Sequence, residues 1–290
     1  MLDNIFDQKV NFEMNVQIFP SHIEDAEYVV LSSGLGGHAQ FWQPQIQDLQ
    51  TKFHVLTYDQ EGCHENSTLL KPDYCIRDLG QQLLLILKQQ HIQRFHFIGH
   101  ALGGFIGAEL AYLCQSTEYQ MLSITILNGW DTLDAHTYKC FETRINLLTC
   151  TGTEAYVKAQ ALFLYPPAWI STNIESIQKQ EQLQIQNFPP HENVLRRLSA
   201  LMNFQLSEDI RAALQNIPMH LIANQDDFLV PYQRSQNLKR LFPHAQLTLL
   251  KQGAHAATVT ETVVMNKEMF GFFNSAGNFS LDYRLFNLAL

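Results

Sequence analysis

The chain of 290 residues has few charged side chains and no long hydrophobic run. Only 16% of its residues are charged, whereas average domains have roughly 25%. The 19 Lys and Arg and 28 Asp and Glu give a formal net charge of −9 at pH 7. An acidic chain without a basic cluster is a poor candidate for binding nucleic acid, because the phosphates require basic surfaces.

Membrane segments and secretion signals are also missing from the sequence. The longest apolar run, residues 83–87, is far shorter than the roughly 20 residues that span a bilayer. The N-terminal segment carries acidic residues early and lacks the apolar stretch of a secretory signal. We therefore expect a cytoplasmic protein with no membrane partner.

Cysteine pairs and metal-binding spacings are absent as well. The five cysteines are odd in number and contain no CxxC, which predicts reduced thiols. Twelve histidines are present, but none forms HExxH or another close ligand pair. The sequence therefore predicts no metal and no cofactor. His38, His64, His100 and His136 are candidates to line a cleft.

Strand and helix patterns alternate through the first half of the chain. Residues 9–20 are predicted to form two opening antiparallel strands, because their hydrophobicity alternates loosely. Further strands are expected at 28–31, 54–58, 95–98 and 123–127, and helices at 42–49, 74–90 and 102–113. This alternation predicts an α/β fold with a mostly parallel sheet and helices on both faces.

The pattern changes after residue 131. Residues 132–206 show helical patterns but no clear strand, and Pro166-Pro167 and Pro189-Pro190 divide them into short helices. Strand patterns return at 219–223 and 247–250. We expect a core made of 1–131 and 207–290, with residues 132–206 inserted as a helical cap.

The most informative motif is Gly99-His100-Ala101-Leu102-Gly103. It matches the G-x-S-x-G nucleophile elbow, a strained turn between a strand and a helix, except that Ala101 stands in place of the nucleophile. Taken alone, the motif is only moderately specific, and a tight glycine turn between strand and helix is the alternative.

An acid and a base follow the elbow in the chain order of such sites. Asp226 and Asp227 come after a predicted strand, and we favour Asp227 because of its spacing to Val230-Pro231; helix capping is the alternative for either. His255 follows the last strand in a glycine-containing loop. The pair predicted to be catalytic is His255 with Asp227.

The oxyanion hole is predicted to consist of backbone N–H groups. One donor is expected at Leu102, directly after the elbow residue, and the other at Leu35 in the glycine-rich segment 33–37. A phosphate cradle is the other reading of that segment, but it lacks G-x-G-x-x-G and a Walker lysine.

Substrate-binding candidates surround this predicted site. His100 is placed beside the elbow and is expected to shape the oxyanion region. Arg144, Arg196 and Arg197 are the basic residues of the insertion best placed to attract an anion, although structural arginines are an alternative for each.

The whole chain resembles the α/β-hydrolase superfamily and, within it, the RutD-type proteins of pyrimidine utilisation. The resemblance spans about residues 25–260, and its matching stretches are SSGLGG (32–37), FWQPQ (41–45), YDQ (58–60), GHALGG (99–104), NGW (128–130), AHTYKCF (135–141), LFLYPPAW (162–169), LRRLSAL (195–201), DDFLVP (226–231) and GAHA (253–256). Trp130 of the NGW motif joins the substrate-binding candidates. The branch resembles this chain in carrying Ala at the elbow, but it tends to have Arg where Glu61 stands here.

This resemblance implies a hydrolase for carbamate or 3-aminoacrylate, products of pyrimidine ring opening. No acyl-enzyme can form without a serine hydroxyl, so His255 is expected to activate water against a substrate that already decomposes unaided. Two alternatives remain: a non-catalytic binding protein, and an engineered Ser-to-Ala esterase. The expected partner is a small molecule, and the expected state is a monomer or homodimer.

Overall fold

A computed structural model describes residues 15–273, which contain one seven-stranded sheet. The strands lie in the order β1-β3-β2-β4-β5-β6-β7, and all neighbours are parallel except β1 and β3. The strand bounds are β1 (Val16–Phe19), β2 (Tyr28–Ser32), β3 (His54–Tyr58), β4 (Arg94–His100), β5 (Gln120–Leu127), β6 (Met219–Asn224) and β7 (Gln246–Leu250). This is the mostly parallel sheet of the α/β-hydrolase fold, as predicted.

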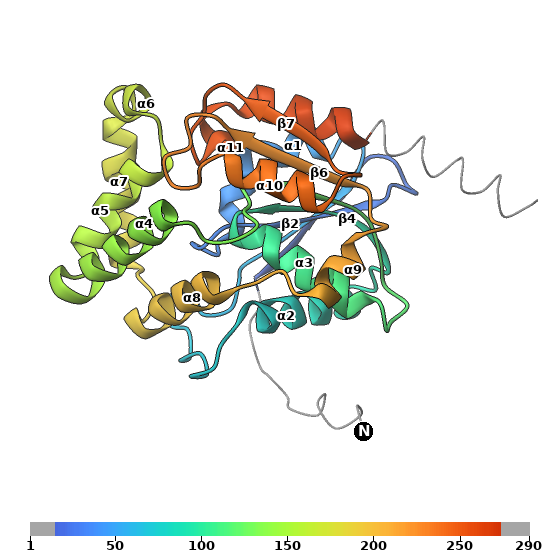
Figure 1. Cartoon of the computed structure of the whole chain (residues 1–290), viewed down its shortest axis with the longest axis horizontal. Coiled ribbons are helices and arrows are strands. Elements are labelled where there is room, and N and C mark those ends of the chain that lie inside the picture. The colour runs from blue at the N-terminus through green and yellow to red at the C-terminus, as the bar shows by residue number, and fades with distance from the viewer. Residues whose placement is uncertain (1–14, 274–290) are drawn as a thin grey trace, which may run out of the picture.

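Helices cover both faces of this sheet (Figure 1). On one face, buried side chains of the strands pack with those of α2 (Ile76–Gln89), α3 (Leu102–Cys114), α9 (Glu208–Leu214) and α10 (Gln233–Leu241). On the other face they pack with η1 (Ala39–Trp42), α1 (Gln43–Leu49), α11 (Ala257–Thr260) and the helical residues 262–273. The sheet is therefore buried on both sides, which explains its near-continuous apolar strands.

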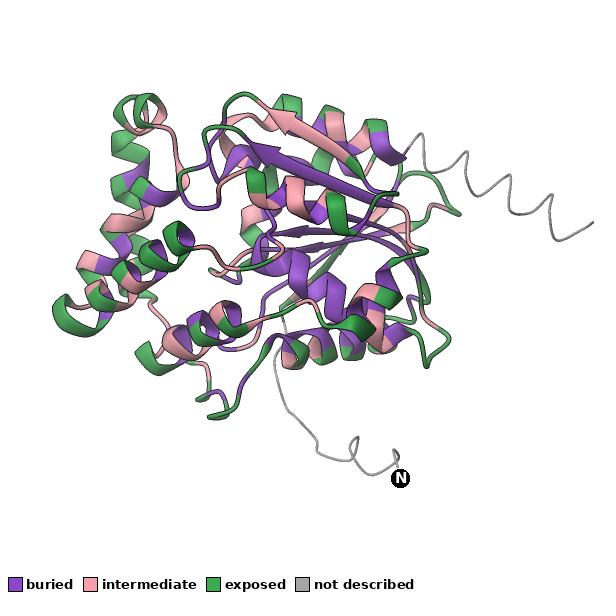
Figure 2. Cartoon of the chain, viewed as in Figure 1, coloured by how far each residue is buried: buried purple, intermediate pink, exposed green. Residues whose placement is uncertain are grey.

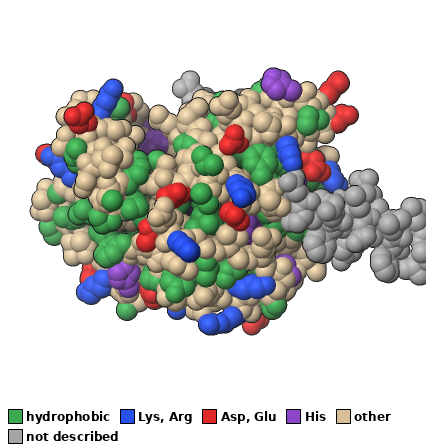
Figure 3. Space-filling model, turned by 90° about the horizontal axis from the view of Figure 1, so that it is seen from above, with side chains coloured by type: hydrophobic (Ala, Val, Ile, Leu, Met, Phe, Trp, Pro, Cys, Tyr) green, Lys and Arg blue, Asp and Glu red, His purple; other side chains and the backbone are tan. Residues whose placement is uncertain are grey.

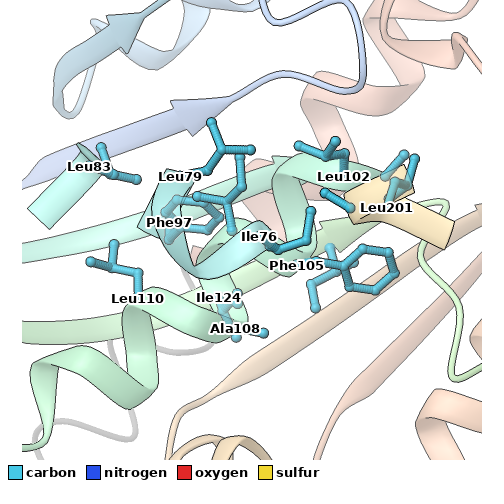
Figure 4. Close-up of a cluster of buried hydrophobic side chains, with 14 of the residues drawn as sticks. Ile76, Leu79, Leu83, Phe97, Leu102, Phe105, Ala108, Leu110, Ile124 and Leu201 are labelled. Carbon is cyan, nitrogen blue, oxygen red and sulfur yellow. The ribbon is translucent and has the colours of Figure 1, made fainter. Parts of the chain in front are cut away.

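The larger of the two hydrophobic clusters lies between β4, β5 and helices α2 and α3 (Figure 4). Phe97 and Ile124 contribute from the strands, and Leu79 and Phe105 contribute from the helices. Burial follows the sheet, whereas the helices between β5 and β6 expose much of their surface (Figure 2).

The chain between β5 and β6 is helical, with no strand in residues 132–206. Its helices are α4 (Ala135–Asn146), the π-helical turn η2 (Leu147–Thr151), α5 (Thr153–Leu164), α6 (Pro167–Thr172), α7 (Ile174–Gln186) and α8 (His191–Asn203). Helices α4 to α7 stand at one end of the molecule, where hydrophobic side chains gather on the surface seen in Figure 3. Leu198 and Leu201 of α8 belong to the same buried cluster as the sheet, and so do Phe141 of α4 and Phe163 of α5. The division into core and cap stays a prediction.

The opening of the chain differs from the sequence-based expectation. One strand, β1, occurs in residues 15–20, and its antiparallel partner is β3 rather than another opening strand. Residues 9–14 lie outside the described range. Among the helices that the structure describes, none has the length and apolarity needed to cross a bilayer.

Candidate active site

The elbow motif forms a tight connection between β4 and α3. Ala101 has φ 47° and ψ −109°, on the left-handed side that non-glycine residues avoid. The glycines are required by close packing: a Cβ on Gly103 would lie 2.1 Å from the carbonyl oxygen of Ser32, and one on Gly99 would lie 2.4 Å from the backbone of Gly103. The backbone thus has the geometry of a nucleophile elbow, although its central residue has no nucleophilic atom.

Three of the four non-glycine residues with positive φ in the described chain follow strands at this end of the sheet. They are Ala101 after β4, Asn128 after β5 and Ala254 after β7. Each such conformation costs about 1–3 kcal/mol, and surrounding structure must impose it. This strain is concentrated at the carboxyl end of the parallel strands, where open α/β sheets bind their ligands.

His255 and Asp227 lie together at this same end. The Nδ1 atom of His255 donates to Oδ2 of Asp227 across 2.8 Å, and both residues are buried. The other carboxylate oxygen, Oδ1, accepts from the backbone N–H groups of Leu229 and Val230. Because Nδ1 carries the proton in this contact, Nε2 of His255 keeps its lone pair and can act as a base.

Asp226, the alternative acid, has a different set of contacts. Its carboxylate accepts from the backbone N–H groups of Gly253 and Ala254, at 3.1 and 2.9 Å. It therefore holds the loop in front of His255, and the residue paired with the imidazole is Asp227.

His100 connects the elbow to the loop of His255. Its Nε2 atom donates to the carbonyl oxygen of His255 across 2.8 Å, and the two rings are 4.7 Å apart. Burial lowers the pKa of His100 to about 3, so the ring is neutral at ordinary pH. Its Nδ1 atom is therefore a buried acceptor, and no hydrogen-bond partner for it occurs among residues 15–273.

Two asparagines that the sequence analysis missed complete this network. Asn128 donates from Nδ2 to the carbonyl oxygen of His255 at 2.7 Å, and Asn224 donates to that of Ala254 at 2.7 Å. Each comes at or directly after the end of an apolar strand, and this position was the available signal. Together with His100 they fix the backbone that carries His255.

The predicted oxyanion donors, Leu35 and Leu102, follow the adjacent strands β2 and β4. Leu102 provides the first N–H of α3, and such groups have no acceptor within their own helix. Leu35 belongs to the segment 33–38, which we call the oxyanion loop. A Cβ on Gly34 would come within 2.9 Å of Nδ1 of His100, so this loop packs against the elbow. The oxyanion role of both N–H groups stays a prediction.

Arg197 holds the oxyanion loop from α8. Its buried guanidinium donates to the carbonyl oxygens of Leu35 and Glu61, at 3.0 and 2.9 Å, and to Oε1 of Gln60 at 2.5 Å. Gln60 in turn donates to the carbonyl oxygen of Ser33. The structural alternative considered for Arg197 therefore fits its contacts, which include the segment that contains Glu61.

Arg144 is buried in α4 but has few polar partners. Its guanidinium donates to the hydroxyl of Tyr156 at 3.3 Å and lies 5.7–6.0 Å from the ring centres of Phe141, Tyr156 and Phe163. In the described residues no carboxylate pairs with it, and its Nε has no partner. His136, one turn back along α4 from Cys140, donates to the carbonyl oxygen of Phe228, so α4 contacts the segment directly after Asp227.

The remaining substrate-binding candidates gain no geometric support. Arg196 pairs with Glu192 one turn earlier in α8, where Glu192 is exposed. Trp130 is buried between Phe105 and Phe141, with ring centres 4.6 and 6.1 Å away. A substrate-binding role for these two residues stays a prediction.

Residues suited to hold a metal gather beside the oxyanion loop. His38, Cys63 and His64 have ligand atoms within 4.8 Å of one another. They belong to the segments that follow β2 and β3, whereas the His255–Asp227 pair follows β7 and β6.

Comparison with known proteins gives one consistent result. Residues 27–137 match the model of the alpha/beta hydrolase fold family. A protein of Acinetobacter baylyi named "Putative carbamate hydrolase RutD" is 52% identical over 263 residues, which cover 91% of this chain and 99% of that protein. Its namesake in Stutzerimonas stutzeri is 42% identical over 261 residues, covering 89% and 94% of the two chains.

Solved structures agree on the fold. The enol-lactonase of Burkholderia xenovorans superposes with a TM-score of 0.77 at 19% identity, covering 90% of this chain and 96% of that structure. The hydrolase MGS-M2 from a deep-sea metagenome gives 0.78 at 15% identity, covering 90% and 94%. Sequence identity over nearly the full length of its relatives, together with this fold, shows that the chain belongs to the RutD family of α/β-hydrolase-fold proteins.

Proposed function

We propose that this protein hydrolyses the C–N bond of a small, labile anion, carbamate or 3-aminoacrylate, by activating water with His255. The observation that carries the proposal is an intact, buried His255–Asp227 pair beside an elbow whose central residue, Ala101, cannot form an acyl-enzyme. The names of the curated relatives support the carbamate assignment.

The reaction starts when Nε2 of His255 removes a proton from water. The resulting hydroxide adds to the carbon that bears the nitrogen, the C–N bond breaks, and the leaving amine takes the proton from His255 as ammonia. Asp227 keeps Nδ1 protonated throughout and stabilises the imidazolium. The N–H groups of Leu35 and Leu102 stabilise the negative oxygen that develops, or the substrate carboxylate.

Arg144 supplies the charge that attracts the anion. A buried guanidinium without a carboxylate partner is costly, and a bound carboxylate offsets that cost with charge-assisted hydrogen bonds. Its contacts with Tyr156, Phe141 and Phe163 hold the side chain in a dry surrounding, where the attraction is stronger than in water. In this proposal residues 132–206 act as the cap that closes over the substrate.

The cellular setting follows from the same features. Cys63, Cys75, Cys114, Cys140 and Cys150 are all unpaired. Free thiols are typical of a reducing compartment, so we place the reaction in the cytoplasm. The partner is the small-molecule substrate, taken up by a monomer or a homodimer.

The decisive experiment follows the decomposition of freshly generated carbamate or 3-aminoacrylate with the wild type and with His255→Ala at equal protein concentration. General base catalysis typically contributes about 10²–10⁴-fold, so His255→Ala should lose acceleration by that factor. Asp227→Asn should lose nearly as much, because the imidazole takes the wrong tautomer. Equal rates for wild type and His255→Ala, with the fold intact by circular dichroism, would identify a binding protein instead.

A second variant tests the missing nucleophile. The wild type should show background turnover of p-nitrophenyl esters, without an acyl-enzyme burst, because Ala101 offers no hydroxyl. Ala101→Ser places one beside His255 and should create measurable esterase activity. Ordinary esterase rates in the wild type would refute the water mechanism.

A further inference from the structure

Two segments outside the catalytic pair bring three metal-ligating side chains together. Cys63 Sγ lies 3.8 Å from Nδ1 of His38, and the rings of His38 and His64 are 5.1 Å apart. The ligand atoms of all three lie within 4.8 Å of one another. The thiol is buried below two exposed imidazoles, so an ion can reach the cluster directly from solvent.

The backbone holds these ligands in place. Gln60 donates its backbone N–H to the carbonyl oxygen of Gly37 across 2.9 Å, joining the oxyanion loop to the segment after β3. Gly37 has φ 82°, and a Cβ there would lie 2.7 Å from the Cβ of Cys63. Only glycine permits this approach, which brings the thiol against His38. The backbone therefore places the thiol beside the imidazole of His38 before any ion binds.

Asp59 orients one of the imidazoles. It is buried, and its Oδ2 accepts from Nε2 of His64 across 3.0 Å, while its Oδ1 accepts from the backbone N–H of Ala39. Since the carboxylate can only accept, Nδ1 of His64 keeps its lone pair. A carboxylate bonded to the second nitrogen of a histidine is the usual support of a metal-ligating imidazole.

We propose that His38, Cys63 and His64 form a binding site for one divalent transition-metal ion of the zinc class. Two imidazoles and a thiolate suit such an ion, with bond lengths of about 2.0–2.3 Å and a solvent water in the fourth position. Binding forms the metal–sulfur bond and releases the thiol proton to solvent. The sequence shows no metal motif because its ligands come from two segments that the sheet brings together.

Occupation of this site would connect the loop that carries Leu35 to the segment after β3. The ion would therefore stabilise the oxyanion loop without touching the His255–Asp227 pair. The proposal is tested independently of the carbamate reaction, because its test measures binding rather than turnover.

The test titrates tag-free, chelator-treated protein with Co²⁺ and, separately, with Zn²⁺. Wild type should bind one equivalent and develop the near-ultraviolet charge-transfer band of a cobalt–thiolate bond. Cys63→Ser should lose this band, whereas Cys150→Ser, at an exposed cysteine in η2, should keep it. His64→Gln, an exposed substitution that leaves the core intact, should weaken Zn²⁺ binding at least about tenfold.

Two outcomes would overturn the proposal. A wild type without the thiolate band shows that the cluster binds no metal through sulfur, and that the contact between Cys63 and His38 is only a hydrogen bond. A band that persists in Cys63→Ser assigns the ion to another thiol, such as Cys140, whose Sγ lies 3.6 Å from Nε2 of His136.

Discussion

The two buried arginines of residues 132–206 differ sharply in their surroundings. Arg197 in α8 donates to three oxygens of the oxyanion loop and the segment after β3. Arg144 in α4 reaches one tyrosine hydroxyl and three aromatic rings. Both are nearly inaccessible to solvent.

This difference separates a structural cation from one suited to a ligand. A buried charge is tolerated when its donors are used, and the guanidinium of Arg197 satisfies that condition within the protein. Arg144 has donors left over, including its Nε. In our proposal, an anionic substrate accepts hydrogen bonds from these remaining donors.

The largest expected effect is on stability, from Arg197→Met. The substitution leaves the oxygens of Leu35, Glu61 and Gln60 without their donor, and each unsatisfied buried acceptor costs about 1–3 kcal/mol. The free energy of unfolding should fall by about 3–5 kcal/mol, measured as a lower midpoint in urea. A loss below about 1 kcal/mol would remove the distinction between the two arginines.

Arg144→Met should weaken substrate binding without lowering stability. Removing an unpaired buried charge leaves stability unchanged or raises it, whereas loss of charge-assisted hydrogen bonds of about 1.5–3 kcal/mol raises KM roughly 10- to 100-fold. Steady-state kinetics on the labile anion measures this, with Arg144→Lys as the charge-retaining control. An unchanged KM in Arg144→Met would assign Arg144 to packing.

His100 extends the comparison to a buried group that carries no charge. Its pKa is lowered from 6.5 to about 3 by burial, and burial of His220 lowers its pKa to about 4. Below about pH 6.5 the unfolded chain binds protons that the folded chain does not. Each of the two histidines therefore lowers the free energy of unfolding by up to about 1.4 kcal/mol for every unit by which the pH is lowered.

Urea unfolding between about pH 7 and about pH 5 measures this slope. His100→Gln should flatten it by the share of one histidine, and so should His220→Gln, which lies away from the elbow on β6. A slope unchanged in His100→Gln would mean that the ring is charged in the folded protein.

The smallest effect is expected at Arg196. Its ion pair with Glu192 lies at the surface of α8, where such pairs contribute about 0–1 kcal/mol. Arg196→Gln should change KM less than twofold, and a tenfold rise would place a second arginine, besides Arg144, in contact with substrate.

Much of the fold could be predicted because apolar runs and turn residues are local signals. The strand at His54–Tyr58 was predicted to the residue, and the helix predicted at 102–113 ends one residue later in the structure. The strand predicted at 95–98 extends to His100, because the elbow continues the strand up to the turn itself. The pairing of the opening strand depends on residues that are distant in sequence, and the local alternation of apolar residues gave no information about that partner.

The candidate site could likewise be predicted only in part. Asp227 and His255 could be found from their order and positions after strands, and the structure brings them within hydrogen-bond distance. The supporting residues Asn128 and Asn224, and the use of Arg197, were missed because each acts on a backbone group far away in sequence. Such long-range contacts leave no characteristic residue spacing in a single sequence.

The hydrogen bonds of Arg197 also set α8 apart from its neighbouring helices in local stability. They fasten α8 to the core, whereas α6 has no buried residue and α7 buries only Ile177. Few buried contacts mean a low free energy of local opening. Backbone amides of α6 and α7 should therefore exchange with solvent sooner than those of α8, which hydrogen exchange measures.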